Sequence, residues 1–253
     1  MGTKRKTHRF KHGDIIDVEE YHDGRYGAPG MGRQKKKKPT PEQMIVVNVM
    51  NKARKARKQL LAYFNTGDYF VTWTYRVDAR PPDMETAQKH FTKAIKYIKR
   101  RYKKAGQPLR WIRNIEQGTR GAWHIHLIIN RIPGTAEMIE DAWEHGGTYA
   151  VQIRKSKFYD EDFTALANYI TKDERLGQRR TDGTYEKPRV KQTSYSTSRN
   201  MPLKEPHKEK LVRWKKEVKA KKGYYIAKIH EGINPATGFK YRRYTMIRLH
   251  MRI

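Results

Sequence analysis

Two histidines are the first residues of this chain whose type and spacing suggest chemistry. His124 and His126 lie two positions apart in the run 123–129 (WHIHLII), which reads as a strand. Side chains of a strand alternate between faces, so both imidazoles project from the same face, about 6–7 Å apart along the chain, and the apolar residues project into the core. Two imidazoles on one rigid face can hold a single metal ion. The tripeptide alone is a weak signal.

Glu116 extends the candidate ligand set. It lies near the end of the predicted strand 110–116, and a short connection with Gly118 and Gly121 leads into the histidine strand. Antiparallel pairing of the two strands would bring its carboxylate beside the imidazoles. Two imidazoles and a carboxylate suit Mn²⁺ or Mg²⁺, although Zn²⁺, Co²⁺ or Ni²⁺ would also bind such a set. The alternative is that the histidine pair is ordinary hairpin surface.

A tyrosine and a lysine supply a second chemical element. On the predicted helix 160–172, Tyr169 points roughly 110° away from the apolar stripe, and Lys172 follows on the same side. Tyrosine is a poor nucleophile at its ordinary pKa of about 10. A metal ion at the scissile phosphate and a nearby ammonium would let it attack a phosphodiester. A rim tyrosine with a solvated lysine is the structural alternative, and Tyr225 and Lys228 repeat the same spacing.

The composition indicates a polyanionic partner. The 253 residues include 56 Lys and Arg against 26 Asp and Glu, a formal charge of +30. Cations set against phosphates release condensed counterions, so nucleic acid is the expected partner. Residues 1–60 carry +10, residues 61–172 carry +6 and residues 173–253 carry +14. The least basic part holds the candidate chemistry, which predicts a catalytic core with cationic flanks.

Several classes of protein are excluded or disfavoured. The absence of cysteine excludes disulfide scaffolds, thiolate zinc fingers and cysteine nucleophiles. Aromatic residues at 11% and apolar residues at 36% exceed what a disordered basic tail would carry. No apolar run approaches the ~18 residues of a membrane span, and the N-terminus lacks an apolar export signal. We therefore expect a cytoplasmic protein that does not bind membranes.

The chain divides into three predicted parts. Residues 1–40 lack apolar periodicity and are expected to form a basic, flexible arm. Residues 41–200 are expected to form the core, with a leading helix that Thr40 caps. Residues 201–253 are expected to form a basic helix over Glu205–Lys222 and a terminal hairpin.

Strands interleave with helices inside the core. The apolar patterns predict a strand at Tyr69–Tyr75, a helix at Met84–Lys104, the hairpin just described, a helix at Ala136–Trp143, a strand at Tyr149–Ile153, the tyrosine helix and a strand at Thr193–Ser198. This order predicts an α+β fold in which helices pack on an antiparallel-rich central sheet.

In this order and spacing the motifs resemble those of the HUH endonucleases, a group named for histidine, hydrophobic, histidine. The closest likeness is to single-tyrosine replication initiators of rolling-circle plasmids and phages, including the filamentous-phage gene II type. The resemblance spans about residues 64–200 and rests on four segments: Tyr69–Tyr75, Glu116 with Gly121–Leu127, Tyr169–Lys172 and Tyr195–Arg199. It implies an RRM-like nuclease core.

The resemblance also implies an activity. Such proteins nick one DNA strand at a replication origin, join their tyrosine to the 5′ phosphate, leave a 3′ hydroxyl as a primer and later rejoin the strand. By this likeness His124 and His126 bind Mn²⁺ or Mg²⁺ with Glu116 as third ligand, Tyr169 is the nucleophile and Lys172 assists it. The expected partner is single-stranded or supercoiled DNA at an origin.

The same likeness leaves two steps to other groups. One tyrosine occupies the motif position, so the closing step would need Tyr225 or a second protomer. The sequence contains no P-loop (GxxxxGK[ST]), so a host helicase and polymerase are expected to unwind and copy the DNA.

DNA-binding residues outside the ligand set follow from residue type. Exposed bases stack on flat aromatic side chains and phosphates pair with cations. The candidates are Trp73 and Tyr75, or Trp111, for stacking, Arg199 for a phosphate, and Lys52, Arg54 and Lys55 on the leading helix. A transposase or relaxase with the same chemistry, and a non-catalytic basic protein that binds single-stranded nucleic acid, are the alternatives.

Overall fold

The computed structural model describes residues 3–22, 40–177, 186–211, 214–233 and 240–250. It divides into two compact units. We call Pro39–Pro202 the central unit, and Met1–Lys38 together with Leu203–Ile253 the terminal unit.

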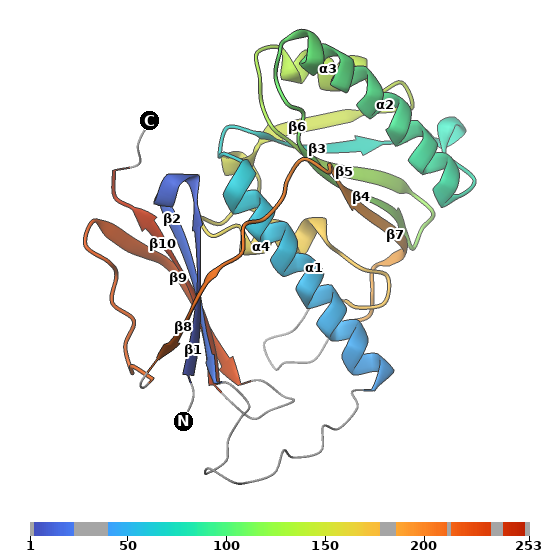
Figure 1. The fold of residues 1–253 in the computed structure, drawn as a ribbon. Helices are drawn as coiled ribbons and strands as arrows, with labels where there is room; N and C mark the ends of the chain where they lie inside the picture. Colours follow the sequence, from blue (N-terminus) through green and yellow to red (C-terminus); the bar gives the residue numbers. More distant parts are fainter. Residues whose placement is uncertain (1–2, 23–39, 178–185, 212–213, 234–239, 251–253) are drawn as a thin grey trace. The chain divides into compact units, whose positions relative to one another are not determined.

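A five-stranded antiparallel sheet forms the middle layer of the central unit. Its spatial order is β6-β3-β5-β4-β7, so the histidine strand lies at the centre (Figure 1). The strands are β3 Tyr69–Thr74, β4 Trp111–Gly118, β5 Trp123–Ile129, β6 Thr148–Gln152 and β7 Val190–Thr197.

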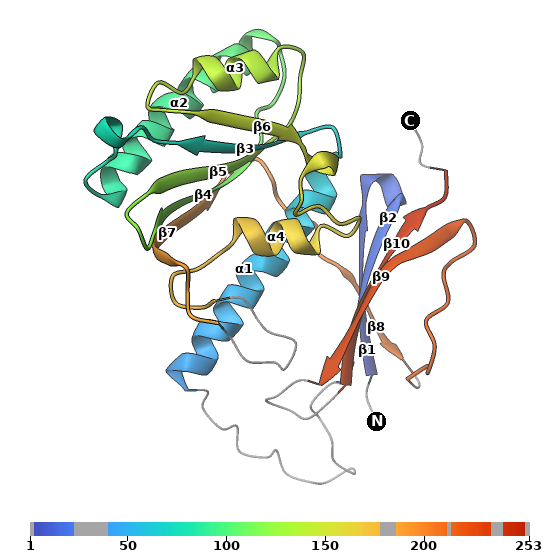
Figure 2. The same ribbon diagram turned by 180° about the vertical axis from the view of Figure 1, so that it is seen from behind.

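Four helices cover the two faces of this sheet. Helices α2 and α3 lie over one face, and α1 and α4 lie against the other (Figures 1 and 2). The helices are α1 Pro41–Tyr63, α2 Met84–Lys104, α3 Thr135–Asp141 and α4 Thr164–Ile170. The predicted α+β fold with an antiparallel sheet is confirmed, and its layers are consistent with an RRM-like fold.

The main apolar core lies between the sheet and α2. Ile125 and Leu127 of β5 are fully buried there, as the alternation of that strand predicts. Phe91 and Ile98 supply the apolar face of α2. Because these residues of β5 point into the core, His124 and His126, which alternate with them, lie on the opposite face.

The start of α1 follows the predicted cap. The Thr40 hydroxyl accepts a hydrogen bond from the Gln43 backbone, and the Gln43 side chain accepts one from the Thr40 backbone. This reciprocal capping satisfies two donors that a helix start leaves open, with Pro41 at the first helical position.

Helix α4 is shorter than the predicted 160–172. Phe163 has a left-handed backbone with φ of 58°, which places it outside the helix. Asp162 accepts hydrogen bonds from the Thr164 backbone and hydroxyl. Asp162 also pairs with Arg57 of α1 at 3.6 Å, and both side chains are buried. This ion pair fixes the start of α4 to α1.

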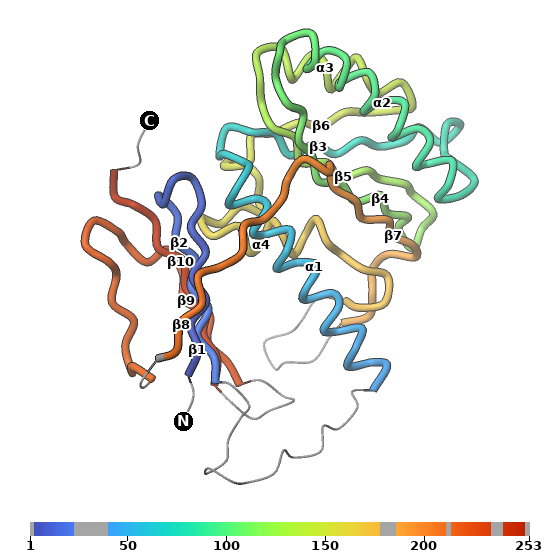
Figure 3. Tube along the Cα trace, viewed as in Figure 1, coloured from blue at the N-terminus to red at the C-terminus, as the bar shows by residue number. Residues whose placement is uncertain are grey.

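Both ends of the chain build the sheet of the terminal unit. Strand β2 from the N-terminal part pairs with β10 from the C-terminal part, and Figure 3 shows the blue and red segments side by side. The order is β8-β1-β2-β10-β9, with β1 Thr3–Phe10, β2 Ile15–His22, β8 His207–Leu211, β9 Tyr224–Ile233 and β10 Lys240–Arg248.

The expectation of a flexible arm over 1–40 is wrong for the residues that form β1 and β2. Ile16 and Val18 are buried in a small core with Tyr244 and Met246. The apolar surface that makes these strands stable comes from the other end of the chain, which local periodicity cannot show. Residues 23–39 of the predicted arm lie outside the described residues.

The expected helix at Glu205–Lys222 is also wrong where the structure describes it. His207–Leu211 forms a strand along the edge of β1, with Glu209 opposite Arg5 at 3.0 Å. Backbone hydrogen bonds to an open strand edge outweigh helix propensity in this segment. The terminal hairpin is confirmed by the pairing of β9 with β10.

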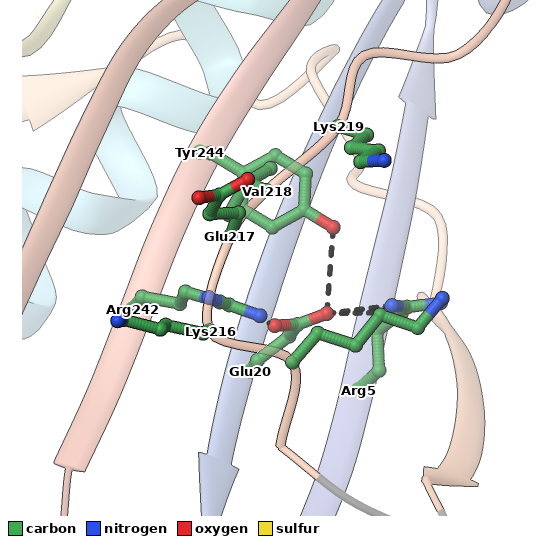
Figure 4. A pocket seen from close by; sticks show the side chains of 9 residues that line it. Arg5, Glu20, Lys216, Glu217, Val218, Lys219, Arg242 and Tyr244 are labelled. Atoms are coloured by element: carbon green, nitrogen blue, oxygen red, sulfur yellow. Dashed lines mark hydrogen bonds and ion pairs between the residues drawn. The ribbon is translucent and has the colours of Figure 1, made fainter.

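A cationic cavity of about 410 Å³ opens in the terminal unit (Figure 4). At its base, the buried Glu20 accepts hydrogen bonds from Arg5 at 2.8 Å and from Arg242 at 2.5 Å. Lys216 and Lys219 line the cavity as well. The Glu20 network neutralises part of the positive charge and ties three strands together.

The boundaries of the central unit differ by two residues at each end from the predicted core of 41–200. Within the described parts of the chain, no helix combines the length and apolar character needed to cross a membrane.

Replacing Arg57 by Met is expected to lower the free energy of unfolding of the central unit by about 3–5 kcal/mol, because it leaves the buried Asp162 without its ion-pair partner. Chemical denaturation measures this change. Arg54→Met on the exposed side of the same helix is the control and should change stability by no more than about 0.5 kcal/mol. Equal effects of the two substitutions would contradict the role of the ion pair.

Candidate active site

The register of the sheet sets the candidate ligands side by side. Glu116 of β4 lies directly opposite His124 of β5. In the next row, His126 lies opposite Asn114 on one side and Thr72 on the other. Residues paired across strands share a face, so all five side chains project from the face that α1 and α4 cover.

The three predicted ligands converge. Their donor atoms all lie within 4.8 Å of one another. The His126 Nε2 atom is 3.0 Å from Glu116 Oε1, and His124 Nδ1 is 4.0 Å from the same oxygen. His126 and Glu116 are buried, whereas the His124 side chain is 38% exposed. The set is therefore anchored at the sheet and open on one side.

Electrostatics keep the carboxylate charged. Burial acts to raise the pKa of Glu116, but hydrogen bonding and charge from His126, together with Lys172, outweigh it and hold the pKa at about 2. Burial lowers the pKa of His124, and the neighbouring His126 lowers it further. An ionised carboxylate and a neutral imidazole are the ligand forms of these side chains.

Thr72 orients the buried imidazole. Its hydroxyl lies 3.1 Å from His126 Nδ1. In the tautomer that carries a proton on Nδ1 and donates it to Thr72, Nε2 keeps a lone pair for a metal ion. Nε2 lies 3.0 Å from Glu116 Oε1, so a metal ion bound by this nitrogen would lie beside the carboxylate.

Tyr169 reaches the same atom from α4. Its hydroxyl lies 3.1 Å from His126 Nε2. Its ring stacks on Phe158 with centroids 3.6 Å apart and meets Phe70 edge to face. The phenol is therefore held by aromatic contacts with its oxygen at the ligand set.

Burial raises the pKa of Tyr169, and the charge of Glu116 raises it further. The phenol is consequently protonated at neutral pH in this state. Positive charge beside the ring is needed before it can act as a nucleophile.

Lys172 supplies that charge. Its Nζ atom lies 3.9 Å from the centroid of the Tyr169 ring and 3.2 Å from Glu116 Oε2. Lys172 follows the C-cap of α4, and Asn114 donates a hydrogen bond to its backbone carbonyl at 3.3 Å. The buried Asn114 thus ties the end of the tyrosine helix to β4.

The expectation that Trp73 and Tyr75 stack on DNA bases is wrong. Trp73 is fully buried and Tyr75 is 7% exposed. Trp73 stacks on Trp143 with centroids 4.9 Å apart, on the face of the sheet opposite the histidines. Trp73 and Tyr75 pack in the apolar core, because the alternation along β3 and the residue after it turns both side chains to the face covered by α2. Trp111 packs against the same core.

The predicted cationic contacts fall into two groups. Lys52 is engaged in an ion pair with the buried Asp173 at 2.7 Å, which fastens α1 to the segment after α4. Arg54 and Lys55 are exposed on α1, and Arg199 is exposed after β7. A DNA-binding role for these three remains a prediction.

Sequence reasoning did not identify Thr72, Asn114 and Phe158. Thr72 and Asn114 lie on strands beside the histidines, and a correct strand register would have found them. Phe158 lies in the segment before α4, and no local sequence pattern predicts its stacking on Tyr169.

The residues present fit a divalent metal ion. One carboxylate and two imidazoles stand close enough to share an ion, the carboxylate is ionised, and a hydroxyl orients the buried ring. The identity of the ion stays a prediction, as Mn²⁺ or Mg²⁺.

Thr72→Val is expected to weaken Mn²⁺ binding about 10–100-fold, because it removes the partner that fixes the ring tautomer of His126. Isothermal titration calorimetry measures the affinity. Thr74→Val is the matched control: the Thr74 hydroxyl donates to the Gly147 carbonyl, so its loss should leave the affinity unchanged. The tautomer argument fails when both variants bind Mn²⁺ like the wild type.

The sequence of the segment that builds this site matches a known family. Residues 68–174 match the family Replication-associated protein ORF2/G2P. This segment begins just before β3 and ends just after α4, so it contains the ligand triad, Tyr169 and Lys172. No curated protein and no solved structure gives a significant match to the chain. Residues 68–174 are therefore similar to the replication-associated protein ORF2/G2P family, a likeness consistent with a rolling-circle replication initiator of the HUH type.

Proposed function

We propose that the protein is a metal-dependent endonuclease that nicks one DNA strand at a replication origin and starts rolling-circle replication. The observation that carries this proposal is the convergence of the phenol and the ligand set. The Tyr169 hydroxyl and the Glu116 carboxylate lie 3.1 Å and 3.0 Å from the same nitrogen of His126. The match of residues 68–174 to a replication-associated family supports the biological role.

The reaction is a transesterification. The Tyr169 oxygen attacks the phosphorus of a phosphodiester, and the bond to the 3′ oxygen breaks. The products are a 5′-phosphotyrosine and a 3′ hydroxyl, which receives a proton and can prime synthesis. Attack by a 3′ hydroxyl on the phosphotyrosine reverses the step and rejoins the strand, so no external energy source is needed. A divalent ion held by Glu116, His124 and His126 would polarise the scissile phosphate.

Lys172 assists the nucleophile. In the described state its ammonium pairs with Glu116 and lies against the Tyr169 ring. When Glu116 binds a divalent cation, the Lys172 ammonium would no longer be needed to neutralise this carboxylate. It would then be available to stabilise the phenolate and the negative charge that develops on the phosphate. Phe158 and Phe70 keep the ring oriented while its proton leaves.

The remaining parts of the proposal concern partners. The substrate is single-stranded or supercoiled DNA at an origin in the cytoplasm, and a host helicase and polymerase complete replication. A transposase or relaxase would make the same cut. A protein that only binds nucleic acid would need the net charge of +30. It would not need Glu116, His124 and His126 to converge.

Wild-type protein incubated with candidate origin single strands and Mn²⁺ is expected to form a denaturant-resistant DNA adduct. Tyr169→Phe should abolish it, because the substitution removes the attacking oxygen and keeps the stacking ring. Mass spectrometry of the adducted peptide locates the linkage. Tyr159→Phe is the matched control and should retain the adduct. An undiminished adduct in Tyr169→Phe would place the nucleophile elsewhere, with Tyr225→Phe as the next variant. Failure of the wild type across a randomised library and several ions would favour simple binding.

Lys172→Met should slow adduct formation by about 10²–10³-fold, because it removes the charge beside the phenol. Single-turnover kinetics at saturating DNA measure this rate. Lys99→Met, at an exposed position of α2 on the opposite side of the sheet, is the control for a general loss of charge. A fall of equal size in both variants would argue against a specific role for Lys172.

A further inference from the structure

We propose that Tyr149 forms a base-binding subsite, on which a nucleobase of the single strand stacks beside the nicking centre. This inference rests on the proposed function, since it assigns a contact to the same DNA. It names a residue that the sequence analysis did not select.

The sheet register puts Tyr149 on the correct face. Thr72 of β3 pairs with His126 on one side and with Tyr149 of β6 on the other. The row Tyr149, Thr72, His126 and Asn114 therefore runs across four strands on one face. Two strand spacings, about 10 Å, separate Tyr149 from the buried histidine. A nucleotide next to the scissile phosphate would lie within that distance.

Tyr149 is also free to accept a base. Its side chain is 63% exposed, and it is the only aromatic residue in the exposed class among the residues that the structure describes. On the opposite face, Trp73 and Trp143 are buried and stacked on each other. An exposed aromatic ring on the face of the sheet that carries the candidate ligands is available to stack on a nucleobase.

The surroundings suit a nucleic-acid backbone. Strand β6 is at one edge of the sheet, so the approach to Tyr149 is not closed by another strand in the central unit as described. The chain after β6 carries three exposed cations: Arg154, Lys155 and Lys157. Exposed aromatic rings and cations along the path of the backbone form the usual combination for sequence-tolerant binding of single strands. We assign the stacked base to Tyr149 and the neighbouring phosphates to these cations.

The test measures DNA binding separately from nicking. In a Tyr169→Phe background, which prevents covalent capture, fluorescence anisotropy with a labelled single-stranded oligonucleotide gives the affinity. Tyr149→Ala should weaken binding about 5- to 150-fold, the usual loss for one stacked base. Tyr149→Phe and Tyr149→Trp should bind within about twofold of the parent. Tyr149→Leu, which is apolar but lacks a π face, should bind like Tyr149→Ala.

A second readout locates the base. 2-Aminopurine placed at successive positions of the oligonucleotide should be quenched at one position near the cut, and Tyr149→Ala should remove that quenching. Val77→Ala is the control, since Val77 is 77% exposed and apolar. It should change neither affinity nor quenching. Because Tyr149 is exposed, thermal unfolding of each variant should match that of the parent.

The outcomes separate this inference from the proposed function. A wild-type adduct with unchanged binding in Tyr149→Ala overturns the subsite and leaves the nicking chemistry intact. Weaker binding in the Ala and Leu variants, with retention in Phe and Trp, supports the subsite even where no adduct forms. Equal binding by Leu and Phe variants overturns stacking as its basis. Failure of the parent to bind any single strand overturns it as well.

Discussion

The pairing register between β4 and β5 is the constraint on which the site depends. Glu116 meets His124 across the hairpin because Ile115 and Ile125 are paired and buried on the opposite face. A shift of one residue would turn the carboxylate into the core and the isoleucine toward the ligands. The apolar side of the hairpin therefore positions the polar side that carries the candidate metal ligands.

The proposed nucleophile, Tyr169, is positioned by a different set of contacts. Helix α4 has only seven residues, too few to be stable alone. It is fixed at its start by the buried pair of Asp162 with Arg57, and at its end by the hydrogen bond from Asn114 to the Lys172 carbonyl. These two attachments hold the Tyr169 hydroxyl beside the Nε2 atom of His126. The metal ligands belong to the sheet, whereas the phenol belongs to a helix that the sheet and α1 hold in place.

The aromatic residues of the central unit divide according to the sheet face. Trp73 and Tyr75 look like DNA-binding residues by type, yet strand alternation sends them into the core. Tyr149 lies on the face that carries the histidines because it pairs with Thr72, and one residue of register separates these outcomes. Aromatic type alone does not distinguish a core residue from a base-stacking residue, because both roles use the same apolar surface.

The sequence by itself determined the central elements. Strand alternation placed both histidines on one face, the capping residues set the start of α1, and the periodicity of α2 defined its buried stripe. The motif order was enough to select the ligand set and the tyrosine. The strand alternation, the helix cap and the helix periodicity depend on residues close together in the chain, so a local pattern contains them.

Only the tertiary structure decided the rest. The terminal unit joins β2 to β10, more than two hundred residues apart, and its strands carry charges that pair across the sheet, such as Arg5 with Glu20. Local hydropathy therefore read β1 as a solvated arm. Likewise Thr72, Asn114 and Phe158 act through neighbours from other strands and helices. Such contacts arise from non-local pairing, whose partners no short window of sequence contains.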